Sequence, residues 1–332
     1  MVFGFLVLIL SVILLGGWSD ATSAITGCVS VRSLPPEQAM RLAAVSTFVG
    51  ALVTGLFRTQ IAKTFYGMAD FGNDPEAALV SLCAALLSVI LWSVPARHFG
   101  FPVSESHALS AGLGGAAVAR TMSLDALDMN QWGRLMLGLL LSTIPAILLS
   151  LLFNYILRLF LLRKNRRAAI ARIRNSQRYS ACWHAAVHGA QDCQKYVGVY
   201  LLGLAFCRGE CEQTLDTVPL SALLVCACVL TMGTLLGNSY VIKKLGRDMS
   251  VLDAPAYSAS NAAASTVMTL CAFLGLPAGI THTRSSALMG AALCQKSKKN
   301  MHVAAQIALS WLLTFPVCAI LAILLSLSLS SL

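Results

Sequence analysis

Six long apolar stretches constrain the fold of this chain more than any other feature of its sequence. They cover residues 1–28, 38–57, 132–162, 182–206, 218–242 and 302–330. A helix needs about 20 mainly apolar residues to cross the hydrocarbon core of a bilayer. Only 11% of the residues are charged, whereas a soluble protein carries about a quarter. We therefore predict an all-α, multi-pass integral membrane protein with the lipid bilayer as its main partner.

Two further apolar stretches, 77–121 and 255–294, are interrupted near their middle by Gly, Pro and small hydroxyl residues. The first interruption reads Gly100-Phe101-Pro102-Val103-Ser104-Glu105-Ser106-His107, and the second reads Gly275-Leu276-Pro277-Ala278-Gly279-Ile280-Thr281-His282. A broken backbone at membrane depth leaves N–H groups that only protein or a water-filled cavity can satisfy. We predict that each stretch forms a re-entrant helical hairpin.

The net charge of +10 comes from basic residues gathered in short clusters between the apolar stretches. With the N-terminus outside, the inner loops hold fifteen Lys and Arg residues and the outer loops hold four. This excess is typical of cytoplasmic loops, and counting either hairpin as a single crossing removes it. We predict a plasma-membrane protein with both termini outside, and the charge pattern gives no reason to expect a nucleic-acid partner.

Each half of the chain contains two helices, a hairpin and a third helix. We predict an N-terminal repeat over 1–162 and a C-terminal repeat over 182–332, joined by a basic cytoplasmic linker, 163–181. Three crossings per half is an odd number, so the repeats must be inverted. Asp20 and Asp192 each follow a predicted glycine-bearing break in the first helix of their half, 87 residues before His107 and 90 before His282. Inverted repeats with broken helices are typical of alternating-access transporters.

Four motifs in this order resemble those of the inorganic phosphate transporter (PiT) family of secondary carriers. The family's Asn-Gly-Phe-His-Asp-Ala-Ala-Asn is matched by Gly16-Gly17-Trp18-Ser19-Asp20-Ala21-Thr22-Ser23. Its His-Gly-Ala-Asn-Asp-Ala-Gln-Lys is matched by His188-Gly189-Ala190-Gln191-Asp192-Cys193-Gln194-Lys195. Its hairpin signature matches 102–107 and 277–282. The resemblance implies a phosphate symporter driven by a H⁺ or Na⁺ gradient, with no cofactor and no bound metal.

Polar residues within these motifs are the candidate site. The resemblance and their chemistry indicate substrate binding by Asp20, Ser104, Ser106, Asp192, Gln194 and Thr281. They indicate ion coupling by Ser23, Glu105, His107, Gln191 and His282. A carboxylate accepts a charge-assisted hydrogen bond from a phosphate P–OH, and sulfate near neutral pH has no such proton. Hydroxyls and backbone N–H groups at a hairpin tip donate to the oxyanion.

The departures from the family pattern bear on the driving ion. Ser23 and Gln191 stand where the family has Asn, Glu105 and Gly279 stand where it has Ser, and the acid expected near Ser260 is absent. Amide and carboxylate oxygens are ligands of hard cations, so we expect a weakened Na⁺ site. Glu105 adds a carboxyl group that a proton can occupy, which favours proton coupling. If Na⁺ drives transport instead, Glu105 is a replacement cation ligand.

Other interpretations stay open at this point. No G-x-x-x-x-G-K-[ST] motif indicates ATP drive, and no G-x-S-x-G motif indicates a hydrolase, so we predict no enzyme. A sulfate or related oxyanion permease on the same fold and a non-transporting nutrient sensor are the alternatives. The aspartates could instead cap helices, the hydroxyls bond to their own backbone, and the histidines hold the hairpins. The roles of Arg97, Lys195 and Arg284 and the oligomeric state, a homo-oligomer among the options, stay undetermined.

Overall fold

The computed structural model describes residues 1–30, 33–98, 103–162, 165–211, 215–237, 252–294 and 299–330. Within these ranges the chain is helical, with a single isolated bridge between Ala69 and Leu127. The elements are α1 (Val2–Ser30), α2 (Pro36–Phe57), α3 (Gln60–Tyr66), α4 (Pro75–His98), α5 (Glu105–Thr121), η1 (Leu124–Ala126), α6 (Met129–Leu162), α7 (Arg166–Cys207), α8 (Leu220–Leu235), α10 (Ala254–Leu274), α11 (Ile280–Leu293) and α12 (Lys299–Ser330).

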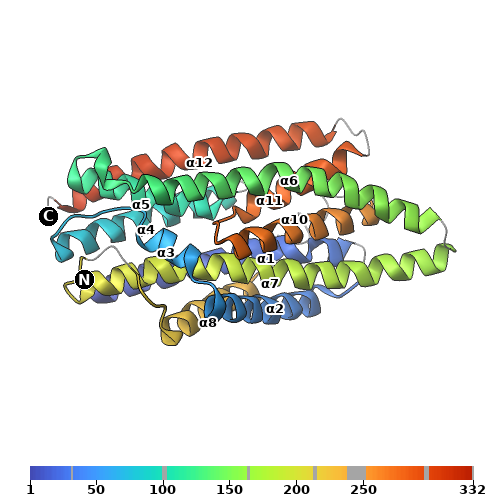
Figure 1. The fold of residues 1–332 in the computed structure, drawn as a ribbon, viewed down its shortest axis with the longest axis horizontal. Coiled ribbons are helices and arrows are strands. Elements are labelled where there is room, and N and C mark those ends of the chain that lie inside the picture. The colour runs from blue at the N-terminus through green and yellow to red at the C-terminus, as the bar shows by residue number, and fades with distance from the viewer. Residues whose placement is uncertain are drawn as a thin grey trace.

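The helices form an elongated bundle in which α6 and α7 run along almost the whole long axis (Figure 1). Both termini lie at one end of the bundle, and the end of α6 and the start of α7 lie at the other. The α4–α5 pair lies toward the end that carries the termini, and the α10–α11 pair lies toward the opposite end. The two predicted hairpins therefore approach the middle of the molecule from opposite directions.

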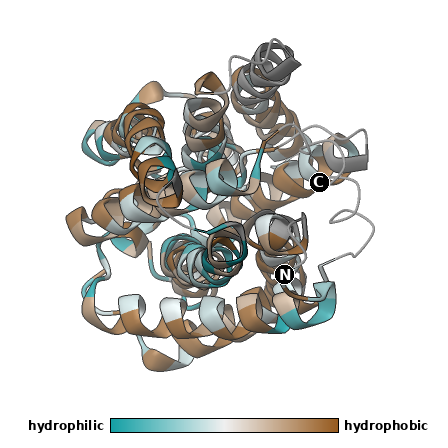
Figure 2. Ribbon diagram, turned by 90° about the vertical axis from the view of Figure 1, so that its right-hand side faces the viewer, coloured by the Kyte–Doolittle hydropathy of each residue, from teal (hydrophilic) through white to brown (hydrophobic). Residues whose placement is uncertain are grey.

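Among the described residues, four helices are long and apolar enough to cross a bilayer. They cover Pro36–Phe57, Pro75–Ala96, Met129–Leu161 and Leu312–Ser330, and shorter apolar segments cover Val2–Trp18 and Leu220–Leu235. Outer helices are largely hydrophobic in Figure 2, and on α6 the side chains of Leu140, Ile144 and Leu148 are exposed at every fourth position. Such a stripe is the surface that lipid covers. Helix α4, the predicted first arm of a hairpin, is long enough to span the membrane by itself.

Helix packing repeats between the two halves of the chain. Helix α2 packs on α7, and α8 packs on α1. Helix α12 packs on α4 and α5, and α6 packs on α10 and α11. Exchanging the first half (α1, α2, α4, α5, α6) with the second (α7, α8, α10, α11, α12) turns each of these pairings into another. Each half thus completes its packing against the other, so neither is an independent domain.

The predicted breaks in the first helix of each half are wrong over the residues described. Helices α1 and α7 continue without interruption past Asp20 and Asp192, so Asp192 lies mid-helix and caps nothing. The glycines serve close packing instead. A Cβ atom added at Gly17 would collide with the carbonyl oxygen of Leu230 in α8, and one added at Gly189 would collide with that of Thr47 in α2. These glycines occupy matching positions in the two motifs, and each makes a close contact with a backbone carbonyl group of a neighbouring helix.

The segment 163–181, which we predicted to be a linker between the two halves, is largely helical. Helix α7 begins at Arg166 and runs for 42 residues, so most of the basic segment 163–181 is the first part of a helix that continues into the bundle. Gln177 binds this part to α10, because its side-chain Nε2 donates to the carbonyl oxygen of Ala254 at 2.9 Å. The basic segment is therefore packed against the second hairpin.

Candidate functional site

The α4–α5 and α10–α11 pairs, which correspond to the two predicted hairpins, meet at the residues that begin α5 and α11. The Thr281 hydroxyl donates to the carbonyl oxygen of Val103 at 3.4 Å. The imidazole rings of His107 and His282 lie edge to face, with centroids 4.2 Å apart. Ser104 is the buried N-cap residue of α5. The structure thus brings together four predicted site residues that two separate hairpins contribute.

Helix α7 contributes a row of buried polar side chains to the same region. His184, His188, Asp192 and Lys195 are spaced by four, four and three residues and therefore share one face of the helix. None exposes more than 3% of its surface. Ionisable residues inside a membrane bundle are costly unless they face the bundle interior and pair with one another. This row accordingly defines the polar side of α7.

Lys195 and Asp192 form the central ion pair of the site. The Lys195 Nζ atom lies 2.6 Å from Asp192 Oδ1, 2.6 Å from Ser106 Oγ and 3.0 Å from the carbonyl oxygen of Ala278. The second carboxylate oxygen of Asp192 lies 3.4 Å from His188 Nε2. Two predicted phosphate ligands, Asp192 and Ser106, are therefore adjacent, and the ammonium group lies between them.

Glu105 is buried and hydrogen-bonded to α7. The Tyr196 hydroxyl donates to Glu105 Oε2 at 2.6 Å. A Cβ atom added at Gly16 would collide with this Tyr196 hydroxyl, so α1 encloses the pair from a third side. No role was predicted for Tyr196 from the sequence. Its position directly after Lys195 in the second motif is the signal that could have identified it.

The two glutamines of the second motif bond mainly to backbone. Gln191 donates through Nε2 to the carbonyl oxygen of Met268, and its Oε1 accepts from the backbone N–H of Ala278, both at 3.2 Å. It thereby ties the loop before α11 to α7 and α10. Gln194 donates to the carbonyl oxygen of Ala190 at 3.1 Å. The side chains of Asp20 and Ser23 lie outside the described residues, although both positions are helical in α1.

A second group of buried polar residues lies beside α7, toward its N-terminus. The Ser265 hydroxyl of α10 lies 3.3 Å from His184 Nδ1. The amide of Asn261 and the hydroxyl of Tyr257, both on α10, have no hydrogen-bond partner among the described residues. Arg284 of α11 is also buried. Buried polar groups are generally satisfied by protein or water, so this region is suited to hold water or a polar solute.

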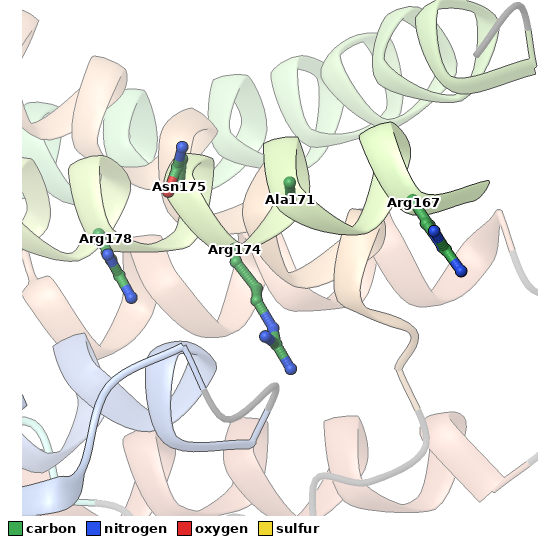
Figure 3. Close-up of a pocket in the computed structure, with 5 residues that line it drawn as sticks. All are labelled: Arg167, Ala171, Arg174, Asn175 and Arg178. Carbon is green, nitrogen blue, oxygen red and sulfur yellow. The ribbon is translucent and has the colours of Figure 1, made fainter. Parts of the chain in front are cut away.

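A separate open cavity of about 340 Å³ lies along the basic start of α7. Arg167, Arg174 and Arg178 line it together with Ala171 and Asn175, and Figure 3 shows the three arginines pointing away from the helix on the same side. Arg178 also donates to the carbonyl oxygen of Ser33. The cavity shares no residue with the site between the hairpins, and its basic lining fits the predicted cytoplasmic side of the protein.

Comparison with known proteins gives a consistent result across almost the whole chain. The model of the phosphate transporter family matches residues 16–176 and 165–322. A "probable low-affinity inorganic phosphate transporter" of Bacillus subtilis is 29% identical over 309 residues, which are 92% of this chain and 90% of that protein. A protein of the same name from Rhizobium meliloti is 28% identical over 93% of this chain and 91% of its own length.

Solved structures contain the same fold. A structure named "The sodium-dependent phosphate transporter" superposes with a TM-score of 0.85 and covers 100% of this chain and 99% of its own. The two sequences are 19% identical. The two proteins therefore share the arrangement of their helices. At this level of sequence identity, the residues of their binding sites can still differ.

Proposed function

This chain belongs to the phosphate transporter family, and on that premise we propose that it is a secondary active symporter that carries inorganic phosphate by alternating access. It is a membrane transporter and not an enzyme. One observation carries the proposal: the buried side chains of Asp192 in α7 and Ser106 at the start of α5 converge on Lys195, beside the loop before α11. A site between two inverted elements is where such carriers bind substrate.

The chemistry of these groups favours phosphate over a fully ionised oxyanion. Phosphate near neutral pH keeps at least one P–OH group, which can donate to the Asp192 carboxylate, while hydroxyls such as that of Ser106 donate to the P–O oxygens. Sulfate offers the carboxylate no proton. Lys195 is bonded to both residues, so a bound phosphate would have to share them with the ammonium group.

The packing of the two halves supports a rocking or gating motion about this site. The pairings of helices are interchanged when the halves are exchanged, so an arrangement opened toward one side of the membrane has a counterpart opened toward the other. The first turn of α11 contacts the segment before α5 through Thr281 and Val103. These contacts are among those that must change when access alternates.

We propose a proton as the coupling ion, with Glu105 as its carrier. Glu105 is buried and has a hydroxyl partner in Tyr196 at 2.6 Å, so its carboxylate form is hydrogen-bonded and its protonated form requires no counter-charge. The structural neighbour is named as sodium-dependent, which makes Na⁺ the alternative. In that case Glu105 serves as a cation ligand.

Uptake of radiolabelled phosphate into proteoliposomes tests the proposal. An inward pH gradient without Na⁺ should drive uptake, and a large excess of unlabelled phosphate, but not of sulfate, should suppress it. Equal suppression by sulfate would favour the oxyanion permease. The absence of uptake under both a pH gradient and a Na⁺ gradient would refute the symporter and favour a nutrient sensor.

A further inference from the structure

The ammonium group of Lys195 fills a cage of three oxygens that come from three separate elements. Asp192 Oδ1 belongs to α7, Ser106 Oγ to the start of α5, and the carbonyl oxygen of Ala278 to the loop before α11. The distances from Nζ are 2.6, 2.6 and 3.0 Å. An ammonium group has three donors and no acceptor, so all three N–H groups are used. The Lys195 side chain is only 2% exposed.

This set of oxygens is what a hard monovalent cation prefers. It consists of one carboxylate, one hydroxyl and one backbone carbonyl, and oxygen donors of these types bind ions such as Na⁺ better than nitrogen or sulfur donors do. A buried carboxylate without a counter-charge is strongly unfavourable. Asp192 therefore requires one positive charge in this cage, and Lys195 supplies it. A Na⁺ ion would supply the same charge.

We propose that Lys195 is a built-in cation that permanently occupies the place of a free coupling cation between the two hairpins. This inference rests on the proposed function and concerns its ion specificity. A free ion binds from one side of the membrane and leaves on the other, and so couples its gradient to phosphate. A tethered ammonium group compensates Asp192 and joins the two hairpins without crossing the membrane. Because Lys195 occupies this cage, Na⁺ cannot bind there.

The rival role for Lys195 is that of a direct phosphate ligand. As placed here, each N–H group already has a protein acceptor, so the ammonium group would have to give up a bond to reach phosphate. The two roles differ in a variant without the charge. A lost phosphate ligand weakens phosphate binding whatever the cation present, whereas a vacated cage creates a new site for a cation.

The test uses the purified full-length protein in detergent, without phosphate, and measures thermal unfolding in NaCl against choline chloride at equal ionic strength. Lys195→Gln removes the charge and leaves an amide oxygen near the cage. A ligand that binds only the folded state stabilises it by mass action. At a Na⁺ concentration ten times its dissociation constant, the ratio of folded to unfolded protein should rise about elevenfold, beyond any response of the wild type.

Two further variants show whether this Na⁺-dependent rise in the ratio of folded to unfolded protein comes from the cage. Asp192→Asn combined with Lys195→Gln should abolish it, because the cage then has no carboxylate. Arg158→Gln is the matched control: it also removes a cation paired with an acid, Asp253, at 2.7 Å, but this pair is 42% and 44% exposed. It should respond to Na⁺ as the wild type does.

Lys195→Ala, which leaves the cage empty, provides a second test in case Lys195→Gln does not fold. Lys195→Ala should show the same increment with Na⁺ or with ammonium, which is the ion closest to the missing group. If neither variant at position 195 responds more strongly than the wild type to either ion, Lys195 is not a built-in cation. The measurement contains no phosphate and no gradient, so failure of wild-type phosphate uptake would refute the proposed function without deciding this inference.

Discussion

The imidazole ring of His107 lies edge to face against that of His282, with centroids 4.2 Å apart and an angle of 88° between the planes. The two residues occupy matching positions in the two predicted hairpins, and both are buried. His107 also contacts Phe315 of α12, with ring centroids 5.9 Å apart. His107 is thus packed both against its counterpart in the second half of the chain and against the last helix. Movement of one hairpin against the other must therefore disturb this contact.

Asp192→Asn should impair phosphate uptake severely while the protein still inserts into the membrane. The amide cannot supply the anionic acceptor for P–OH, and losing a hydrogen bond to a charged group weakens affinity by about 1.5–3 kcal/mol, or roughly tenfold to a hundredfold. The measurement is the concentration dependence of initial phosphate uptake, with protein amount in the membrane as control. The repeat gives the same expectation for Asp20→Asn. Wild-type uptake by both variants at limiting phosphate would show that the aspartates are structural.

Glu105→Gln should blunt the response of phosphate uptake to an imposed inward pH gradient, because an amide cannot take up and release the coupled proton. Tyr196→Phe is the matched control, since it removes the 2.6 Å hydrogen bond to Glu105 but keeps the carboxyl group. It should retain a response to the gradient. If wild-type uptake requires Na⁺ and ignores the pH gradient, proton coupling is wrong and Glu105 is a cation ligand.

A cysteine at position 175 should react with a membrane-impermeant thiol reagent only after the cytoplasmic side has been exposed. The fifteen-to-four distribution of basic residues predicts that the segment 163–181 faces the cytoplasm. Asn175 is exposed on the surface of α7, whereas its neighbour Ser176 contacts Ser258 at 2.7 Å and is a poorer position for a probe. The assay needs a background without native cysteines. Labelling in intact cells would reverse the predicted orientation.

Gly189→Ala should destabilise the bundle, because the added methyl group would meet the carbonyl oxygen of Thr47. Overpacking of this kind costs about 1–3 kcal/mol. Gly133→Ala in α6 is the control, since nothing lies within 4 Å of the added atom, and alanine favours a helix over glycine by about 0.5–1 kcal/mol. In thermal unfolding in detergent, Gly189→Ala should unfold at a lower temperature than the wild type, and Gly133→Ala at a higher temperature. A neutral Gly189→Ala would mean that α2 and α7 can move apart at little cost.

Local features of the sequence were sufficient to predict much of the fold. The length of an apolar stretch decides whether it can cross a bilayer, and the predicted 38–57 and 132–162 agree with α2 and α6 to within three residues. The glycine-bearing breaks were predicted wrongly for a physical reason. Glycine weakens a helix in isolation and also allows close packing of two helices, and the choice at Gly189 depends on Thr47, which lies in another helix.

Many of the buried polar residues that meet between α5, α7 and α11 were singled out from the sequence because they lie in motifs, whereas Tyr196 and the pairing of these residues were not. The side chain that meets Glu105 is Tyr196, and Lys195 joins Ser106 to Ala278. These partners lie in different helices and loops, and hydrogen bonds between them form only when the two halves pack together. The sequence by itself determined a membrane-embedded helical carrier and its polar motifs, since length, polarity and order along the chain are local properties. Only the tertiary structure decided that an ammonium group lies between the two hairpins, because that position depends on which oxygens the packing brings within reach of Nζ.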